Sequence, residues 1–349
     1  MLQDMNQIAQ RLSQWLTAQG APRSTVTQLK SSSGGYSNIT LLATFSQPDG
    51  SDPLDMVVRI QPKTAAVYPD CDVRLQYRTM ELLQNSGLPV PRLYGLELNP
   101  EVLGAPFFIM GRLEGQVPAE NPLYHLEGWL HDLDTASIRR HWFAGIDGFA
   151  QLSKLDWKAL GFSFLLPPAG TTPLQQQLAY YEHMLSWSES ISGQHYEWLH
   201  RGLQWLQRHQ PRNEPEALSW GDAKMGNCVF KNGQLSGMLD WERPAIANPV
   251  DDLSWWLMLD ESLCTGFGLP RLAGLPSREE SIAHWEAASG HSAEHLPYYD
   301  VFSAWRFTLV MSRIGHIFTQ RGWVAADQRM DHNNGGSTLL KNLALQYDF

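Results

Sequence analysis

The chain has 349 residues, more than one hydrophobic core usually serves, so its length predicts two lobes with separate cores. A formal net charge of -10 argues against a nucleic-acid partner, because phosphate backbones are bound by an excess of lysine and arginine. The three cysteines, Cys71, Cys228 and Cys264, lie far apart without CxxC spacing, so the sequence predicts neither a disulfide framework nor a structural zinc site.

The sequence also predicts a cytoplasmic protein, as a monomer or a homodimer, with no membrane partner. The first residues lack a basic segment followed by an apolar core, and no apolar run approaches the roughly 20 residues that span a bilayer. A content of 43% hydrophobic and 18% charged residues is typical of a packed globular protein, which excludes a disordered chain.

Residues 1–112 are predicted to form a small lobe built on an antiparallel sheet. Ile8, Leu12, Trp15 and Leu16 recur at helical spacing and predict an opening helix over residues 4–19. Runs of β-forming residues then predict strands, with one further helix among them. The predicted strands cover residues 24–29, 39–45, 56–60, 92–97 and 106–110, and the helix covers residues 72–85.

Residues 113–349 are predicted to form a larger, mainly helical lobe. Helical periodicity predicts helices over residues 137–153, 174–188, 195–209, 277–289, 298–320 and 323–345. The exception is a hairpin in which two short apolar runs, residues 228–230 and 235–239, flank the turn Asn232-Gly233. The predicted fold class is therefore α+β with two lobes.

Asp222, Asn227 and Asp240 form the most informative pattern. Asn227 follows Asp222 by five residues within SWGDAKMGN, residues 219–227, and Asp240 ends the predicted hairpin. Phosphoryl transfer needs such a set, because one carboxylate must accept a hydroxyl proton while an amide oxygen and a second carboxylate hold magnesium. An Asp-x4-Asn pattern is weak alone, since both residues are common in turns. Its occurrence with the hairpin and the second aspartate favours a catalytic function.

This segment resembles the catalytic loop of the aminoglycoside phosphotransferase and choline kinase superfamily, whose pattern is His-Gly-Asp, four residues, Asn. The resemblance implies a protein-kinase-like fold that uses ATP, or less readily GTP, with Mg²⁺. It implies Asp222 as the catalytic base and Asn227 and Asp240 as metal ligands. Trp220 stands where the family usually has histidine. Asp252, in an Asp-Leu pair after the hairpin, is implied to brace the loop.

The same resemblance places a nucleotide-phosphate loop between the first two predicted strands. Ser33, Gly34, Gly35, Ser37 and Asn38 are the candidate residues there. Glycines let backbone N–H groups approach an anion, and serines add donors. The alternative is a flexible hairpin loop without a ligand.

Arg59 lies on an apolar strand, where kinases carry the lysine that pairs with the α and β phosphates. The alternative is an edge-strand arginine that points to water. The next helix should supply a glutamate to hold the cation, but Gln76 stands there, and Asp72, one turn earlier, is the alternative partner. Met110 ends the strand expected at the adenine.

The sequence therefore predicts a kinase that phosphorylates a hydroxyl group of a small molecule. The acceptor stays open between an antibiotic, a choline-like amine and a hydroxyacyl thioester, because acceptor contacts have no readable code. The alternative is a pseudokinase that binds a nucleotide or a partner without turnover, as Trp220, Arg59 and Gln76 suggest.

Overall fold

The computed structural model describes most of the chain, and the residues it describes are 5–19, 25–31, 38–47, 50–63 and 67–349.

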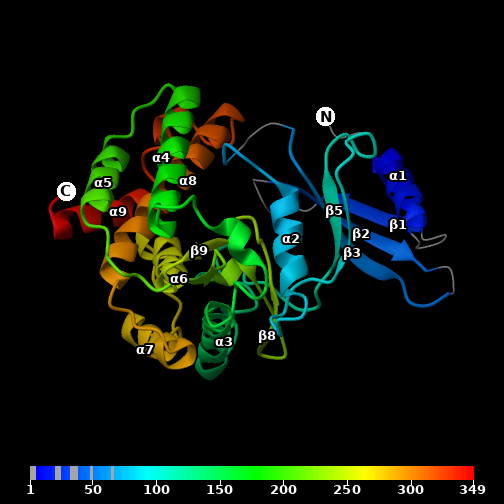
Figure 1. Ribbon diagram of the computed structural model, residues 1–349, viewed down its shortest axis with the longest axis horizontal. Coiled ribbons are helices and arrows are strands. Elements are labelled where there is room, and N and C mark those ends of the chain that lie inside the picture. Colours follow the sequence, from blue (N-terminus) through cyan, green and yellow to red (C-terminus); the bar gives the residue numbers. More distant parts are fainter. Residues whose placement is uncertain (1–4, 20–24, 32–37, 48–49, 64–66) are drawn as a thin grey trace. The chain divides into compact units, whose positions relative to one another are not determined.

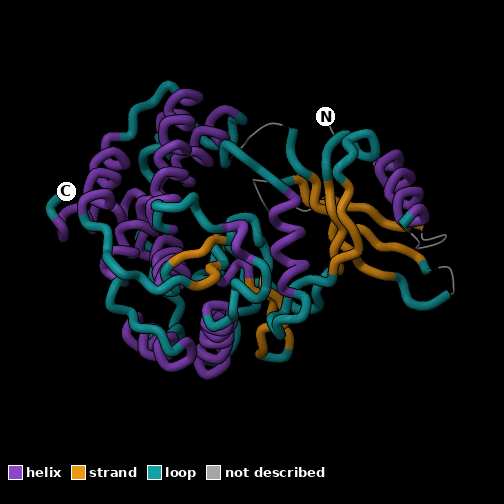
Figure 2. Tube along the Cα trace, viewed as in Figure 1, coloured by secondary structure: helices purple, strands orange, loops and turns teal. Residues whose placement is uncertain are grey.

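The chain divides into two compact units. The first comprises Met1–Asn85 and Val90–Leu113, and the second comprises Ser86–Pro89 and Glu114–Phe349. Strands dominate the first unit and helices dominate the second (Figure 2). The predicted α+β class, with an antiparallel sheet followed by a mainly helical part, is confirmed.

The first unit is built on a five-stranded antiparallel sheet with the strand order β1-β2-β3-β5-β4 (Figure 1). The five strands match the predicted ones to within two residues at each end, and the two helices of the unit match as closely. The strands are β1 Thr25–Ser31, β2 Ile39–Ser46, β3 Leu54–Ile60, β4 Leu93–Glu97 and β5 Phe107–Gly111, and the helices are α1 Met5–Ala18 and α2 Val73–Leu83.

Alternation along β2 and β3 separates the two faces of this sheet. Leu41 and Val58 are fully buried in the cluster that includes Leu12 and Trp15 of α1. Because successive strand side chains point to opposite faces, the residues between them lie on the face away from α1. Arg59, paired in register with Thr40, belongs to that second face.

The second unit is a helical body with two short strand pairs, β6 with β9 and β7 with β8. Among the described residues, six tryptophans of this unit are almost completely buried: Trp142, Trp220, Trp241, Trp256, Trp285 and Trp305. The helices are α3 Thr135–Ser153, η1 Phe162–Leu165, α4 Pro173–Ser192, α5 Glu197–Arg208, η2 Met225–Asn227, α6 Val250–Leu263, η3 Thr265–Phe267, α7 Arg278–Ser289, α8 Leu296–Gln320, η4 Ala326–Gln328 and α9 Gly335–Tyr347. The strands are β6 Ala217–Ser219, β7 Cys228–Lys231, β8 Gln234–Met238 and β9 Ala245–Ala247.

The prediction of one helix over residues 323–345 is wrong. A short turn, η4, and a loop precede α9, which starts only at Gly335. Asn334 caps α9 by accepting a hydrogen bond from the backbone N–H of Ser337. Asparagine is a favoured N-cap residue, and two glycines at the start of α9 disfavour an earlier helix.

Among the described residues, none of the helices combines the length and the apolar character that a membrane span requires.

Candidate active site

The predicted catalytic loop connects β6 to β7 in the second unit. Gly221 begins its turn with φ of 83°, a left-handed conformation that favours glycine. A Cβ atom added there would lie 1.8 Å from the backbone oxygen of Arg243, so no larger side chain fits. The loop ends in η2, and Asn227 is buried at the start of the hairpin.

The Asp222 carboxylate is held by two side chains. Asn227 Nδ2 donates to Asp222 Oδ2 over 2.7 Å and to the Asp222 backbone oxygen over 2.9 Å. Trp255 Nε1, from α6, donates to Asp222 Oδ1 over 2.8 Å. Both carboxylate oxygens are therefore oriented before any ligand arrives, as a base for a positioned hydroxyl requires.

Burial raises the pKa of Asp222 above its ordinary value, the negative charge of Asp240 adds to the rise, and Lys224 and the Trp255 hydrogen bond oppose it. A raised pKa brings a carboxylate closer to the range in which it accepts and releases protons near neutral pH. The carboxylate remains partly reachable, with 23% of its side chain exposed.

Lys224 places a positive charge beside this base. Its Nζ lies 3.0 Å from Glu120 Oε2 and 4.0 Å from Asp222 Oδ2. Burial disfavours the charged amine, but the carboxylates of Glu120 and Asp222 hold the pKa of Lys224 above its ordinary value. The group is therefore a cation at neutral pH, beside the Asp222 carboxylate. Transferred phosphoryl groups carry negative charge that such a cation stabilises.

Asp240 follows the hairpin of β7 and β8, whose turn residues Asn232 and Gly233 both have positive φ. Asp240 itself has φ of 58°, a conformation uncommon outside glycine and tolerated best by Asn and Asp. The Leu239 N–H donates to the Asn227 backbone oxygen over 2.9 Å, so the two candidate metal ligands are fixed to one another through the backbone.

Trp220 adds a second link between the loop and Asp240. The side chain is fully buried, and its Nε1 donates to the Leu239 backbone oxygen over 2.9 Å. Its ring also packs against Trp241 at a centroid distance of 5.6 Å. The indole thus occupies the position that the resemblance gives to histidine, and it fixes the residue before Asp240.

Asp252 braces the loop from α6. Its carboxylate accepts hydrogen bonds from Ser219 Oγ at 2.9 Å, the Trp220 N–H at 2.8 Å and the Gly221 N–H at 3.0 Å. Burial raises the pKa of Asp252 to about 6, although these three donors oppose the rise. The bracing role implied from the sequence matches this geometry.

In the first unit, Arg59 meets Gln76. Arg59 Nε donates to Gln76 Oε1 at 3.4 Å, and Nη1 donates to Thr40 Oγ1 at 3.0 Å. The alternative partner, Asp72, is instead the N-cap of α2 and pairs with Arg74 at 2.8 Å. The idea that Asp72 lies one turn before Gln76 on the same helix face is therefore corrected, because the residue has extended backbone and precedes the helix.

Two of the other candidate nucleotide-binding residues, Asn38 and Met110, lie in the described part of the chain. Asn38 is buried and accepts a hydrogen bond from Cys71 Sγ at 3.0 Å. Met110 lies on β5, in register with Val57 of β3, and is partly exposed. The remaining loop residues lie outside the described part of the chain: Ser33, Gly34, Gly35 and Ser37.

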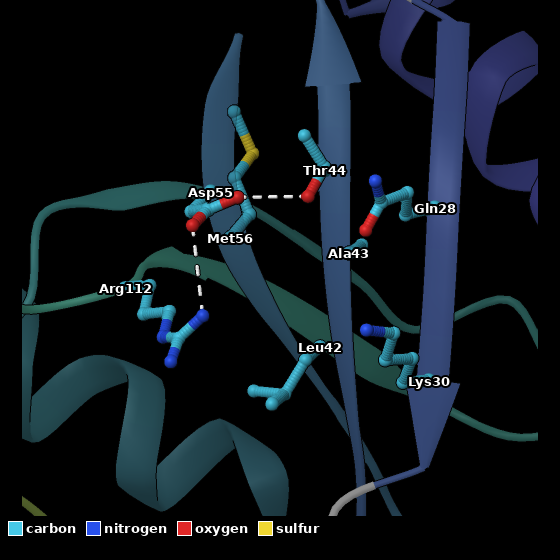
Figure 3. Close-up of a pocket in the computed structure, with 8 residues that line it drawn as sticks. All are labelled: Gln28, Lys30, Leu42, Ala43, Thr44, Asp55, Met56 and Arg112. Atoms are coloured by element: carbon cyan, nitrogen blue, oxygen red, sulfur yellow. Dashed lines mark hydrogen bonds and ion pairs between the residues drawn. The ribbon is translucent and has the colours of Figure 1, made fainter.

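A hollow of about 460 Å³ lies on the first unit's sheet (Figure 3). Leu42, Thr44 and Asp55 contribute to its lining from β2 and β3, and by alternation they share the face of Arg59. Figure 3 shows the side chains of Lys30 and Arg112 beside it. The sheet face that carries Arg59 is thus hollowed, and it bears Lys30 and the ion pair of Arg112 with Asp55 at 3.5 Å.

The sequence analysis missed three residues of the site. Trp255 lies in an apolar segment, which favours a core position, and the hydrogen bond of its indole to Asp222 depends on how α6 packs against the loop. Lys224 stands inside the catalytic loop, two residues after Asp222, and a cation so close to the base was a readable signal. Glu120, about 100 residues earlier, has no sequence signal that links it to Lys224.

The sheet unit, the helical unit and the loop that presents Asp222 define the fold of kinase-like phosphotransferases. A Ralstonia eutropha structure described as a candidate aminoglycoside phosphotransferase covers 97% of this chain and 98% of its own length, with TM-score 0.71 and 18% identity. The GDP complex of an aminoglycoside 2'-phosphotransferase covers 96% and 97%, with TM-score 0.60 and 15% identity. A Plasmodium vivax ethanolamine kinase covers 92% and 82%, with TM-score 0.57 and 14% identity.

The family model of the phosphotransferase enzyme family matches residues 28–291, and the chain belongs to that family. The resemblance inferred from the catalytic loop is confirmed.

Curated relatives are longer proteins. The mouse acyl-CoA dehydrogenase family member 10 is 22% identical over 270 residues, which are 74% of this chain and 24% of the relative. The rat acyl-CoA dehydrogenase family member 11 is 24% identical over 81% of this chain and 35% of its own length. The chain therefore spans about a quarter to a third of the length of these relatives.

Proposed function

We propose that the chain transfers the γ-phosphoryl group of ATP to a hydroxyl group of a small molecule, in a magnesium-dependent reaction. The observation that carries this proposal is the arrangement around Asp222. A carboxylate with a raised pKa is held by Asn227 and Trp255, next to the cation of Lys224 and the second carboxylate of Asp240. Membership of the phosphotransferase enzyme family supports the reaction class.

Asp222 accepts the proton of the acceptor hydroxyl while that oxygen forms its bond to the γ-phosphorus, and the bond from phosphorus to the β–γ bridging oxygen breaks to release ADP. Lys224 stabilises the charge on the phosphoryl oxygens as they pass. Trp255 and Asn227 keep the carboxylate turned toward the hydroxyl.

The donor set at the end of the hairpin fits Mg²⁺. Asn227 uses its Nδ2 for Asp222, so the amide oxygen is its atom for a metal, and Asp240 offers a carboxylate. Such oxygen donors are the ligands that Mg²⁺ prefers, and the ion keeps several waters and phosphate oxygens around it. When bound, Mg²⁺ neutralises charge on the phosphates.

Arg59, held by Gln76, is proposed to bind the nucleotide phosphates. Met110 is proposed to contact the adenine. The residues proposed to bind the phosphates from the loop are Ser33, Gly34, Gly35, Ser37 and Asn38. The hollow on the face of the sheet that carries Arg59 supports this assignment. The nucleotide-bound state of similar structures, among them a GDP complex, supports nucleotide use in general. ATP is proposed over GTP as the donor, and the ADP- and ATP-bound structures of other aminoglycoside phosphotransferases support that choice.

The acceptor proposed for the first test is a hydroxyacyl thioester. The curated relatives carry the name acyl-CoA dehydrogenase, and this chain corresponds to only part of their length. A phosphotransferase joined to such an enzyme is expected to act on a related acyl compound. Amino alcohols and aminoglycosides are the alternatives, after the ethanolamine kinase and the aminoglycoside phosphotransferases that share the fold.

The experiment is a panel assay of ADP release with ATP, Mg²⁺ and these three acceptor classes. Asp222→Asn keeps the shape of the side chain and is the matched control, and it should lower turnover by a factor on the order of a hundred or more. Phosphorylation of one acceptor class by the wild type alone is the expected result. Magnesium-dependent ATP binding without turnover of any acceptor would instead favour the pseudokinase alternative.

A further inference from the structure

The connection between α4 and α5 brings two histidines to one carboxylate. His200 Nε2 lies 2.9 Å from Glu189 Oε1, and His195 Nδ1 lies 3.2 Å from the same oxygen. The three ligand atoms all lie within 4.8 Å of one another. The His195 side chain is 64% exposed and the His200 side chain 35%, so an ion can reach the cluster from solvent.

Two further groups hold these side chains in place. The Tyr196 N–H donates to Glu189 Oε1 over 2.8 Å. Glu197 Oε2 lies 3.4 Å from His195 Nε2, the ring nitrogen that faces away from Glu189. A histidine that binds a metal usually donates its other ring N–H to a carboxylate, which fixes the tautomer and raises the basicity of the ligand. The cluster therefore has both ligand atoms and outer partners.

We propose that Glu189, His195 and His200 form a binding site for a divalent transition metal, with Zn²⁺ as its best-fitting ion. Two imidazole nitrogens and one carboxylate oxygen are a known zinc ligand set that leaves the fourth position to water. Imidazole nitrogen favours Zn²⁺, Cu²⁺ and Ni²⁺ over Mg²⁺ and Ca²⁺.

The distances agree with this ion. Zinc bonds of about 2.0–2.1 Å in a tetrahedron place neighbouring ligand atoms about 3.3–3.4 Å apart. The separations of 2.9 Å and 3.2 Å from Glu189 Oε1 are close to that spacing. The two imidazole rings stack at a centroid distance of 4.6 Å, which keeps both histidines on the same side of the carboxylate. Binding therefore requires small side-chain rotations rather than a new fold.

A second group with the same kind of residues, His125, Asp260 and Cys264, does not fit a cation. Both carboxylate oxygens of Asp260 are already used, Oδ1 by the Tyr124 hydroxyl at 2.6 Å and Oδ2 by Arg271 Nε at 2.6 Å. The arginine also supplies the positive charge that a metal would bring. At Glu189, by contrast, two of the neighbouring groups are histidines, whose ring nitrogens are themselves metal ligands.

The ion would join the last turn of α4 to the first turn of α5. Glu189 lies three residues before the end of α4, and His200 lies in the first turn of α5, so one ion would cross-link two neighbouring helices. The ligand set shares no residue with the proposed magnesium site at Asn227 and Asp240. The zinc proposal is therefore independent of phosphoryl transfer, and either can fail without the other.

The test is a calorimetric titration of the untagged protein with Zn²⁺ alone. His195→Ala is the main variant, because the side chain is largely exposed and its loss should not disturb folding. His284→Ala is the matched control, since His284 Nε2 forms a comparable pair with Asp147 Oδ1 at 2.7 Å without a third ligand of this kind among the described residues. Glu197→Gln tests the outer carboxylate.

The wild type and His284→Ala should bind the same number of zinc equivalents, and His195→Ala should bind one fewer. Glu197→Gln should weaken that equivalent about tenfold, the lower end of what outer partners contribute. A zinc-edge anomalous signal between Glu189 and His200 in crystals should accompany the lost equivalent. Equal zinc stoichiometry and affinity in the wild type and His195→Ala, or no zinc binding by the wild type, would overturn the proposal.

Discussion

Replacing Trp255 with phenylalanine is expected to slow phosphoryl transfer while leaving nucleotide binding intact. The substitution removes the indole N–H that donates to Asp222 Oδ1 over 2.8 Å. It keeps an aromatic ring in contact with Phe307 and under the Arg306 guanidinium, whose centre lies 4.8 Å from the indole. The change therefore tests one hydrogen bond to the proposed base.

The expected fall in kcat follows from the negative charge of Asp222, which accepts the hydrogen bond from Trp255. Hydrogen bonds to charged groups contribute about 1.5–3 kcal/mol. The bond is already present before the reaction, so its loss lowers kcat through poorer orientation of the carboxylate. Since about 1.4 kcal/mol corresponds to a factor of ten in rate, the upper limit of this effect is about tenfold to a hundredfold. The Michaelis constant for ATP should stay unchanged, because Trp255 contacts the base and not the proposed nucleotide residues.

The pH profile supplies a second readout. A hydrogen bond to the ionised form lowers the pKa of a carboxyl group, so its loss raises the pKa of Asp222, which burial already raises. Asp222 must be ionised to accept a proton. The acidic limb of the kcat/KM profile should therefore move to higher pH in the Trp255→Phe variant.

Trp256→Phe is the matched control. Trp256 is the next residue of α6 and is almost completely buried, but its indole N–H has no hydrogen-bond partner among the described residues. The control should lose stability through the missing volume and keep the acidic limb of the wild type. Steady-state kinetics across pH, below the melting temperature of each variant, make the comparison. An unchanged kcat and acidic limb in Trp255→Phe, or an equal shift in Trp256→Phe, would refute the reasoning.

Three further predictions concern the same proposal. Lys224→Met should lower kcat/KM and move the acidic limb of its pH profile to higher pH, because Lys224 opposes the raised pKa of Asp222. It should also destabilise the fold by about 1–3 kcal/mol, less than the loss of a partner from a fully buried ion pair. If the cation is incidental, chemical denaturation and the pH profile will show neither effect. Asp240→Ala should abolish the magnesium dependence of ATP binding, so calorimetry that finds wild-type dependence in the variant contradicts the ligand assignment. Arg59→Ala should raise the Michaelis constant for ATP and lower turnover together, whereas Gln76→Glu should have a milder effect, and unchanged kinetic constants in Arg59→Ala would make it a surface arginine.

The catalytic loop could be predicted from the sequence because its chemistry and its local structure coincide. Asp222 and Asn227 are five residues apart, and a short turn brings their side chains together whatever surrounds them. The hairpin before Asp240 was equally readable, since Asn232-Gly233 matches the backbone that a tight turn between strands demands. Local signals thus located the chemical groups.

Helix α6 was not predicted, although it supplies both Trp255 and Asp252. Twelve of its fourteen residues are buried, so its apolar and polar residues show no helical periodicity. A helix buried on all sides lacks the amphipathic pattern by which the other helices were found. The short strands β6 and β9 were missed for a related reason, since three residues are too few for a period-two pattern.

The ion pair of Lys224 and the hydrogen bond of Arg59 depend on long-range packing. Lys224 meets Glu120 across about 100 residues of chain, and Arg59 of β3 meets Gln76 because α2 packs against β4 and β5 of the same sheet. Asp72 illustrates the opposite error. Helical spacing placed it near Gln76, but an aspartate at a helix start is a favoured N-cap, and its side chain bonds the adjacent backbone.

The three hydrogen bonds of Asp252 have a consequence for how the catalytic loop can move. The amide protons of Trp220 and Gly221 are bonded to a carboxylate that belongs to a helix about 30 residues later, in the interior of the second unit. These amides can exchange with deuterated solvent only when that carboxylate withdraws. Hydrogen exchange at both positions should therefore be as slow as in the centre of α6, although they lie in a loop. Because the backbone of this loop is hydrogen-bonded to the core, we expect relatives that use different acceptors to differ in other segments.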